Sequence, residues 1–365
     1  MVVNQKKIQY GQFTTPLRYV GLAAEWLSSY IDSSYIILDS SCGNGVFFAL
    51  SWSFPSNRFI GADIDEKLIN RNILKYSFLA DFYHRNSLFN VSRSAYRIQN
   101  DAKLCVVGNP PYNDSTSKSK RQIKQKLTGI DCDIKSRDLG LSFLNSYNKL
   151  RADIVLILHP FSYLIKRANR REAGQFFDNY KLERHIIFSS KVFDGTNKSN
   201  QFPVILGLYR RDGEGTRDIE CIEFKTEEGD SFRLADYTFV SQYCSKYPGK
   251  RTGSGIWFYS MRDVNALKRN RSFVKNPTKS CLEVDESKLG YYCWCDLFKR
   301  FAKVPYWMGN FDIPLPKNGL TCSELEVCCR VSKYLNRDIF GEQLKPGMDD
   351  FEDVLALLRS VGCFS

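Results

Sequence analysis

The chain contains a short segment, Asn109-Pro110-Pro111-Tyr112, that could bind and orient an amino group. The amide oxygen of Asn109 and the carbonyl oxygen of Pro110 can both accept hydrogen bonds from an NH2 group, and the ring of Tyr112 can stack on the plane that carries it. Each proline fixes its own φ and restricts the residue before it, so the backbone here is stiff. The segment predicts a site for a planar group bearing an amine. The alternative is an ordinary strand-to-loop turn.

The residues before this segment predict a buried strand. Leu104 to Val107 form a short apolar run, which is typical of a strand buried on both faces. Gly108 and the prolines end this strand, because proline cannot donate a hydrogen bond to a neighbouring strand. Doubly wound α/β proteins bind their ligands at the carboxyl ends of their strands. We therefore expect Asn109 and Tyr112 at a ligand site.

Two further strand ends upstream could bind a nucleoside. The run from Tyr35 to Leu38 predicts a buried strand that ends at Asp39, and the turn Gly43-Asn44-Gly45 precedes a predicted helix. A second strand ends at Asp63, about 20 residues after this turn, where an acid would bind ribose hydroxyls. The turn has no third glycine and no Gly-Lys-Ser/Thr, which disfavours a dinucleotide site or a P-loop. Alternatively, Asp63 caps the next helix.

A helix is predicted near the N-terminus. Thr15 suits the N-cap and Pro16 the first helical position, with the helix continuing to about Tyr30. The free N–H groups at its start could bind a carboxylate, although a plain capped surface helix has the same pattern.

The whole pattern predicts two domains. Roughly seven strands alternate with helices before about residue 212, which favours an α/β fold with a doubly wound sheet. After Arg211 the alternation ends, and the last ~40 residues predict two helices. We expect a catalytic domain over residues 1–220 and a smaller α+β domain over residues 221–365.

The charge distribution favours a polyanionic partner. The 365 residues carry a net charge of +12. Residues 118–126 hold five basic residues and no acids, so this stretch is either solvated or binds phosphates. Residues 243–280 hold nine basic residues and one acid, and are either a solvated face or a nucleic-acid surface. The basic residues chosen as substrate contacts are Lys118, Lys120, Arg121, Lys268, Arg269 and Arg271.

Other features of the sequence indicate a cytoplasmic protein without a membrane partner. No run approaches the ~20 apolar residues of a membrane span, and the N-terminus lacks the apolar region of a signal peptide. The twelve cysteines include no C-x2-C pair, which favours a reducing compartment. The late cysteines, such as Cys293 and Cys329, suit buried small side chains better than a zinc site. We expect no metal.

Together, these motifs resemble the amino-group (N6-adenine) DNA methyltransferases of restriction–modification systems, in the class with a C-terminal recognition domain. The segments that carry the resemblance are YGQFTTP, DSSCGNG, GADIDEK and GNPPY, within about residues 8–210. Four positions depart from the family pattern. The family usually has an aromatic residue where Thr14 stands, proline where Ser40 stands, and Ser or Thr where Asn44 stands. The adenine-contacting acid expected near residue 86 is replaced by Asn86.

The resemblance implies a seven-stranded, mostly parallel S-adenosylmethionine-dependent methyltransferase fold, with S-adenosylmethionine as cofactor and double-stranded DNA as substrate. A cognate restriction endonuclease sharing the recognition site is a candidate partner, and a prokaryotic cytosol or nucleoid is the expected location. The resemblance implies that the catalytic residues are Asn109, Pro110, Pro111 and Tyr112, and that Phe193 contacts the edge of the substrate adenine. It also implies that the cofactor is bound by Tyr10, Gln12, Thr14, Thr15, Pro16, Asp39, Ser41, Cys42, Gly43, Gly45, Asp63, Ile64 and Asn86.

The implied mechanism is methyl transfer by positioning. The methyl group of a sulfonium is already activated, so the reaction needs no metal. Two acceptors at Asn109 and Pro110 would turn the amine lone pair toward that methyl group, after the adenine has left the duplex. An RNA or protein-glutamine methyltransferase would use the same catalytic segment, and an inactive nucleic-acid-binding protein is a third hypothesis. A protein substrate would not require the basic residues 118–126 or a second domain.

Overall fold

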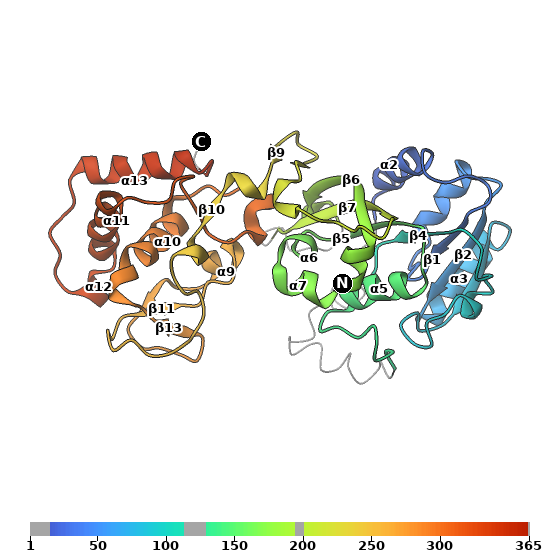
Figure 1. The fold of residues 1–365 in the computed structure, drawn as a ribbon, viewed down its shortest axis with the longest axis horizontal. Helices are drawn as coiled ribbons and strands as arrows, with labels where there is room; N and C mark the ends of the chain where they lie inside the picture. Colours follow the sequence, from blue (N-terminus) through green and yellow to red (C-terminus); the bar gives the residue numbers. More distant parts are fainter. Residues whose placement is uncertain (1–14, 113–128, 194–200, 364–365) are drawn as a thin grey trace. The chain divides into compact units, whose positions relative to one another are not determined.

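The computed structural model describes residues 15–112, 129–193 and 201–363, and the chain divides into two compact units (Figure 1). The first unit contains the chain up to residue 219 together with residues 224–231. The second unit contains residues 220–223 and the chain from residue 232 onward. The short strands β8 (Phe224–Lys225) and β9 (Ser231–Phe232) lie where the chain passes between the units.

A seven-stranded sheet forms the centre of the first unit, with the strand order β3-β2-β1-β4-β5-β7-β6 (Figure 1). Strand β7 is antiparallel to both of its neighbours, and the other pairs are parallel. The strands are β1 (Ile36–Asp39), β2 (Arg58–Asp63), β3 (Ala80–His84), β4 (Leu104–Gly108), β5 (Ile154–Pro160), β6 (Tyr180–Ser189) and β7 (Pro203–Arg211). This sheet, with the smaller second unit, confirms the predicted fold class.

Helices cover this sheet because its central strands are apolar on both faces. The helices of the first unit are α2 (Leu17–Leu27), α3 (Glu66–Tyr76), α5 (Leu139–Lys149), α6 (Ser162–Ile165), α7 (Arg167–Glu172) and α8 (Gly174–Asn179). Its 3₁₀ helices are η1 (Val46–Trp52), η2 (Ser94–Tyr96), η3 (Ser190–Val192) and η4 (Ile219–Cys221). Helix α2 and η1 pack against Ile37, Cys105 and Leu156. Leu38 and Val106, which alternate with these residues, are fully buried as well.

The strand order reverses between β1 and β4, and this reversal brings two predicted strand ends together. Leu38 of β1 pairs with Val106 of β4 in a parallel register. Asp39 and Asn109 therefore leave the sheet at the same edge, side by side. This is the topological switch point at which open α/β sheets bind their ligands.

Two local predictions were wrong. Helix α2 begins after Pro16, which is the N-cap, so Thr15 does not cap it, and the helix ends at Leu27 rather than near Tyr30. The helix predicted after the glycine turn is present, and it is a 3₁₀ helix. A 3₁₀ helix has three residues per turn, so Phe47 and Leu50 share one buried face.

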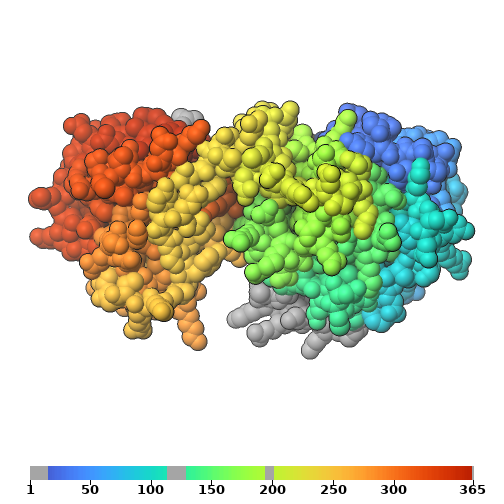
Figure 2. All heavy atoms as spheres, viewed as in Figure 1, coloured from blue at the N-terminus to red at the C-terminus, as the bar shows by residue number. Residues whose placement is uncertain are grey.

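The second unit combines short strands with helices. Its strands form a pair, β10 (Thr238–Phe239) with β14 (Pro314–Leu315), and a three-stranded sheet, β12 (Phe273–Val274), β11 (Trp257–Tyr259) and β13 (Cys281–Glu283). Its helices are α9 (Val264–Arg269), α10 (Leu289–Phe301), α11 (Cys322–Leu335), α12 (Arg337–Phe340) and α13 (Met348–Ser360). Its 3₁₀ helices are η5 (Leu234–Asp236), η6 (Val240–Gln242), η7 (Glu286–Lys288) and η8 (Tyr306–Asn310). On the face shown in Figure 2, the C-terminal helices of this unit form a continuous surface.

Two features are absent from the described residues. None of the helices in the described ranges is long and apolar enough to cross a membrane. Within the same ranges, no three His, Cys, Asp or Glu side chains are grouped so as to hold a metal ion. Of the late cysteines, Cys293, Cys295 and Cys328 are buried.

Candidate functional site

A cavity in the first unit lies at the carboxyl ends of β1, β2 and β4. It brings together residues from four predicted motifs that are far apart in the sequence. The predicted residues that line it are Thr15, Asp39, Ser41, Cys42, Gly43, Asp63, Ile64, Asn86, Asn109 and Pro111. Its wall also includes residues that the sequence analysis did not select, among them Ser87, Leu88 and Phe143. The three strand ends therefore form one site.

The glycine turn is fixed from both sides. The N–H of Gly43 donates to Asp63 Oδ2 at 2.8 Å, and the carbonyl of Gly43 accepts from Nδ2 of Asn72 at 2.9 Å. Gly43 and Gly45 have φ angles of 51° and 75°, which favour glycine. Asn72 is a buried residue of α3 that the sequence analysis missed. The signal available in the sequence was an asparagine three residues after Ile69, on the apolar face of the helix.

The structure separates the roles of two neighbouring acids. Asp65 is the N-cap of α3, and its Oδ1 accepts from the N–H of Lys67. The alternative that Asp63 caps this helix is therefore wrong. Asp63 Oδ1 accepts from the N–H of Asp65 at 2.9 Å, while its Oδ2 holds Gly43. Burial raises the pKa of Asp63. Each carboxylate oxygen has a second lone pair, so both remain able to accept from a ligand.

Asp39 is a buried carboxyl group beside Gly108, the residue that precedes the Asn109–Tyr112 segment. It is 3% exposed, and its Oδ1 accepts from the N–H of Ser41 at 3.1 Å. Burial, with a smaller contribution from the charge of Asp63, raises the pKa of Asp39 to about 8. A Cβ atom at Gly108 would lie 2.9 Å from Asp39 Oδ1, so only glycine allows this close approach. The sequence analysis had treated Gly108 only as the end of a strand.

Asn109 lies at the end of β4 and contacts the start of the N-terminal helix. Its Nδ2 donates to Oγ1 of Thr15 at 3.2 Å, and Thr15 is buried. Thr15 was predicted as a cofactor ligand, and in the structure its hydroxyl accepts a hydrogen bond from the amide of Asn109. The side chain of Thr15, which was predicted to cap the helix, therefore contacts Asn109 instead.

The two aromatic residues of the predicted site are buried. Tyr112 packs edge-on against Phe202, with 6.4 Å between ring centroids, and burial raises its pKa. Phe193 is 2% exposed and packs edge-on against Phe188 in the hydrophobic core. It is not among the residues that line the cavity. Contact between Phe193 and a substrate base stays a prediction, and it requires this ring to become exposed.

The amide of Asn86 supports the cavity wall. Its Nδ2 donates to the carbonyl of Gly129 at 2.7 Å, and its Oδ1 accepts from the N–H of Leu88 at 3.0 Å. It was predicted to bind the cofactor, and it does line the cavity. Its polar atoms, however, join the loop after β3 to the chain segment that begins at Gly129.

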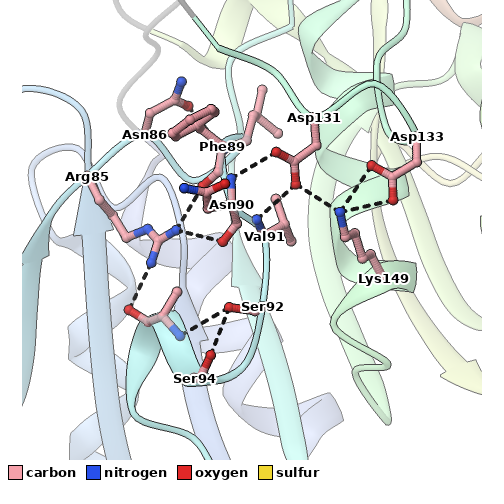
Figure 3. A network of polar contacts seen from close by, with 12 residues as sticks. Arg85, Asn86, Phe89, Asn90, Val91, Ser92, Ser94, Asp131, Asp133 and Lys149 are labelled. Carbon is pink, nitrogen blue, oxygen red and sulfur yellow. Dashed lines mark hydrogen bonds and ion pairs between the residues drawn. The ribbon is translucent and has the colours of Figure 1, made fainter.

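A second network holds the same two segments together (Figure 3). The carboxylate of Asp131 accepts from the N–H groups of Asn90 and Val91, at 2.8 and 2.9 Å. On its other side it pairs with the ammonium of Lys149 at 2.8 Å, which also contacts Asp133. The sequence analysis missed this network, because its members come from three separate segments.

The remaining predicted residues lie elsewhere or outside the described ranges. In the second unit, Lys268 Nζ donates to the carbonyl of Ala302, the C-cap of α10, at 3.1 Å. Arg269 and Arg271 are exposed. Pro16, Gly45 and Pro110 adjoin the cavity in sequence but are not among its lining residues. The predicted residues that lie outside the described residues are Tyr10, Gln12, Thr14, Lys118, Lys120 and Arg121.

Comparison with known proteins finds distant structural neighbours among the solved structures. No protein-family model matches the chain, and no curated protein matches it. A methyltransferase structure from Anabaena variabilis is 10% identical, covers 53% of this chain and 84% of that one, and has a TM-score of 0.36. A TehB-like methyltransferase from Corynebacterium glutamicum is 14% identical, with coverages of 53% and 94% and a TM-score of 0.31. The 23S rRNA methyltransferase ErmE is 13% identical, with coverages of 56% and 71% and a TM-score of 0.35.

The topology itself defines the fold. Strand β7 lies between β5 and β6 and is antiparallel to both, at one side of an otherwise parallel sheet. This order is that of the class I S-adenosylmethionine-dependent methyltransferase fold, as the sequence predicted.

Proposed function

We propose that this protein is an S-adenosylmethionine-dependent methyltransferase that methylates the N6 amino group of adenine in DNA, as the modification enzyme of a restriction–modification system. One observation carries the proposal. A single cavity at the switch point of the sheet is lined by a buried carboxyl group, a glycine turn, and Asn109 and Pro111 of the Asn-Pro-Pro-Tyr segment. This set can receive a cationic nucleoside on one side and an amine on the other.

The donor set fits S-adenosylmethionine. Bound there, the cofactor supplies a methyl group already activated by its positively charged sulfur. Asp39 offers a buried carboxyl group to this positive charge, and Asp63 offers acceptors to the ribose hydroxyls. Gly43 allows the backbone to approach closely, because it has no Cβ. These residues would bind and orient the cofactor.

The catalytic segment supplies the acceptors for the substrate amine. The amide oxygen of Asn109 and the carbonyl of Pro110 would accept its two hydrogens and direct its lone pair toward the methyl group. Acceptors that are already in place at the transition state are worth about 2–4 kcal/mol each. An adenine must leave the duplex to reach this segment, which costs a few kcal/mol of unstacking.

The choice of DNA as substrate rests on charge and on the second unit. The chain carries a net charge of +12, and residues 243–280 carry nine basic residues and one acid. Phosphate contacts from such a surface position a protein on nucleic acid. An RNA or protein-glutamine substrate would use the same catalytic segment, so the experiment must compare all three.

Incubation with cofactor labelled at the methyl group tests the proposal, using separate pools of DNA, RNA and protein as acceptors. We expect label in DNA, as N6-methyladenine within one sequence context. Asn109→Ala should bind the cofactor normally in a calorimetric titration and transfer methyl groups at least about 10²-fold more slowly. Label found only in RNA or protein would overturn the DNA assignment, and an Asn109→Ala variant as active as wild type would overturn the catalytic role.

A further inference from the structure

The amide of Asn109 has a specific orientation in the structure. Its nitrogen faces Thr15, with Nδ2 3.2 Å from the threonine hydroxyl oxygen. The two ends of an amide lie on opposite sides of its carbon, so this bond turns the amide oxygen away from Thr15. An amide turned the other way would offer NH2 where the substrate amine needs an acceptor.

The bond joins two residues that are 94 positions apart and both line the cavity. Thr15 is 2% exposed, and it lies directly before Pro16, the N-cap of α2. Helix α2 in turn is fixed by Tyr19, Ala23 and Leu27, which are buried in the core under the sheet. The hydroxyl of Thr15 is therefore held in place by the packing of α2 in this core.

We infer that Thr15 is a positioning residue, whose hydroxyl orients the amide of Asn109 so that its oxygen accepts from the substrate amine. The inference rests on the proposed function for the identity of the reaction. It changes the role of Thr15 from a cofactor ligand to a residue that acts through Asn109. Without this bond nothing holds the amide nitrogen toward residue 15, so only a minor part of the enzyme would present the oxygen to the substrate amine.

Two substitutions separate these roles. Thr15→Ser keeps the hydroxyl, whereas Thr15→Val keeps the shape and removes the acceptor. We expect Thr15→Val to lower kcat by on the order of tenfold, with cofactor Kd within about twofold of wild type, and Thr15→Ser to recover most of the rate. The double variant Thr15→Val/Asn109→Ala should be no slower than Asn109→Ala alone, because Thr15 acts only through the amide that Asn109→Ala has already removed.

Thr216→Val is the matched control. Thr216 is also buried in the first unit, where its hydroxyl donates to the carbonyl of Tyr180 and accepts from the N–H of Leu182. It does not line the cavity. The same loss of a buried hydroxyl should lower the melting temperature there and leave kcat per folded enzyme unchanged.

A readout without catalysis completes the test. Protein labelled with 15N-asparagine shows the side-chain NH2 group of Asn109, whose signal is assigned by its loss in Asn109→Ala. The protons of this group should exchange with solvent several-fold faster in Thr15→Val than in wild type or Thr15→Ser. Wild-type exchange and wild-type kcat in Thr15→Val would overturn the inference. So would a weakened cofactor Kd with unchanged kcat, which would make Thr15 a cofactor ligand. If wild type methylates no acceptor, the proposed function fails, and the exchange rates alone decide the role of Thr15.

Discussion

Asp39 shows how the fold changes the chemistry of one residue. Its carboxyl group ends β1, and the groups that face it are the N–H of Ser41, the acid Asp63, the thiol of Cys42 and the phenol of Tyr147. None of these groups is a cation. Burial therefore dominates and raises the pKa of Asp39 to about 8. In the cofactor-free protein this residue is largely protonated at neutral pH, and a bound cation would favour its ionised form.

The pKa of Asp39 predicts a pH-dependent stability. An unfolded aspartate has a pKa of about 3.9, so between pH 4 and pH 8 the folded state holds a proton that the unfolded chain does not. The stability that protonated Asp39 contributes is fully present below about pH 4 and is lost as the pH rises through about 8. The side chain in Asp39→Asn is neutral at every pH, so this variant should not show that loss of stability. In melting curves of cofactor-free protein, Tm of the variant minus Tm of wild type should increase from pH 5 to pH 9. A difference that stays constant with pH would contradict the raised pKa.

At the scale of elements, the carboxyl ends of β1 and β2 and the start of α3 form one support for the glycine turn. Asp63 ends β2 and holds the turn, whereas Asp65, two residues later, caps α3. The two acids have the same side chain and lie at the same strand-to-helix junction. They differ in what their oxygens contact, which makes them a matched pair for substitution.

We expect Asp63→Ala and Asp65→Ala to have different consequences. Asp63→Ala removes the acceptor of the Gly43 N–H as well as the proposed ribose acceptor, so cofactor Kd should rise at least about tenfold, together with a loss of stability. Asp65→Ala removes a helix cap, which costs about 1 kcal/mol of stability, and should leave cofactor Kd near wild type. Calorimetric titration beside melting curves measures both. Equal cofactor affinities in the two variants would show that Asp63 has only a structural role.

At the scale of the whole molecule, basic charge is concentrated in two stretches of sequence, and one of them lies in the second unit. Its structure changes which residues suit a test of nucleic-acid binding. Lys268 was predicted as a substrate contact and is also an exposed residue. Its ammonium, however, donates to the carbonyl of Ala302, and partial burial lowers the pKa of this group. Arg269 and Arg271 are exposed, and the Nε of Arg269 donates to the carbonyl of Asn265 in its own helix.

Arg269→Ala/Arg271→Ala should therefore weaken DNA binding and flatten its salt dependence, by about 0.9 in slope for each phosphate that is no longer neutralised. Cofactor binding should be unchanged, since the proposed cofactor site lies wholly within the first unit. Lys268→Ala is the control, and it should lower the melting temperature with little effect on the slope. DNA affinity measured across a salt series decides the matter. A double variant with wild-type slope and affinity would indicate that these arginines only form a solvated surface.

The sequence by itself determined the sheet and the edge at which the cavity lies. The apolar runs that end at Asp39, Asp63 and Gly108 are local patterns, and each became a strand with the predicted end. Burial on both faces requires continuous apolar residues, so such strands can be recognised from composition alone. The fold class followed from the alternation of strands and helices, because parallel strands need crossover connections.

Only the tertiary structure decided how the side chains at that edge are used. The bond from Asn109 to Thr15, the close approach of Asp39 to Gly108 and the bond from Asn86 to Gly129 all join segments that are distant in sequence. A local pattern shows that a polar residue lies at a strand end but not which partner it meets. That partner depends on the strand order and on the packing of helices from elsewhere in the chain. For this reason the sequence selected Thr15 and Asn86 for the cavity, and the folded chain gave both of them bonds to other parts of the protein.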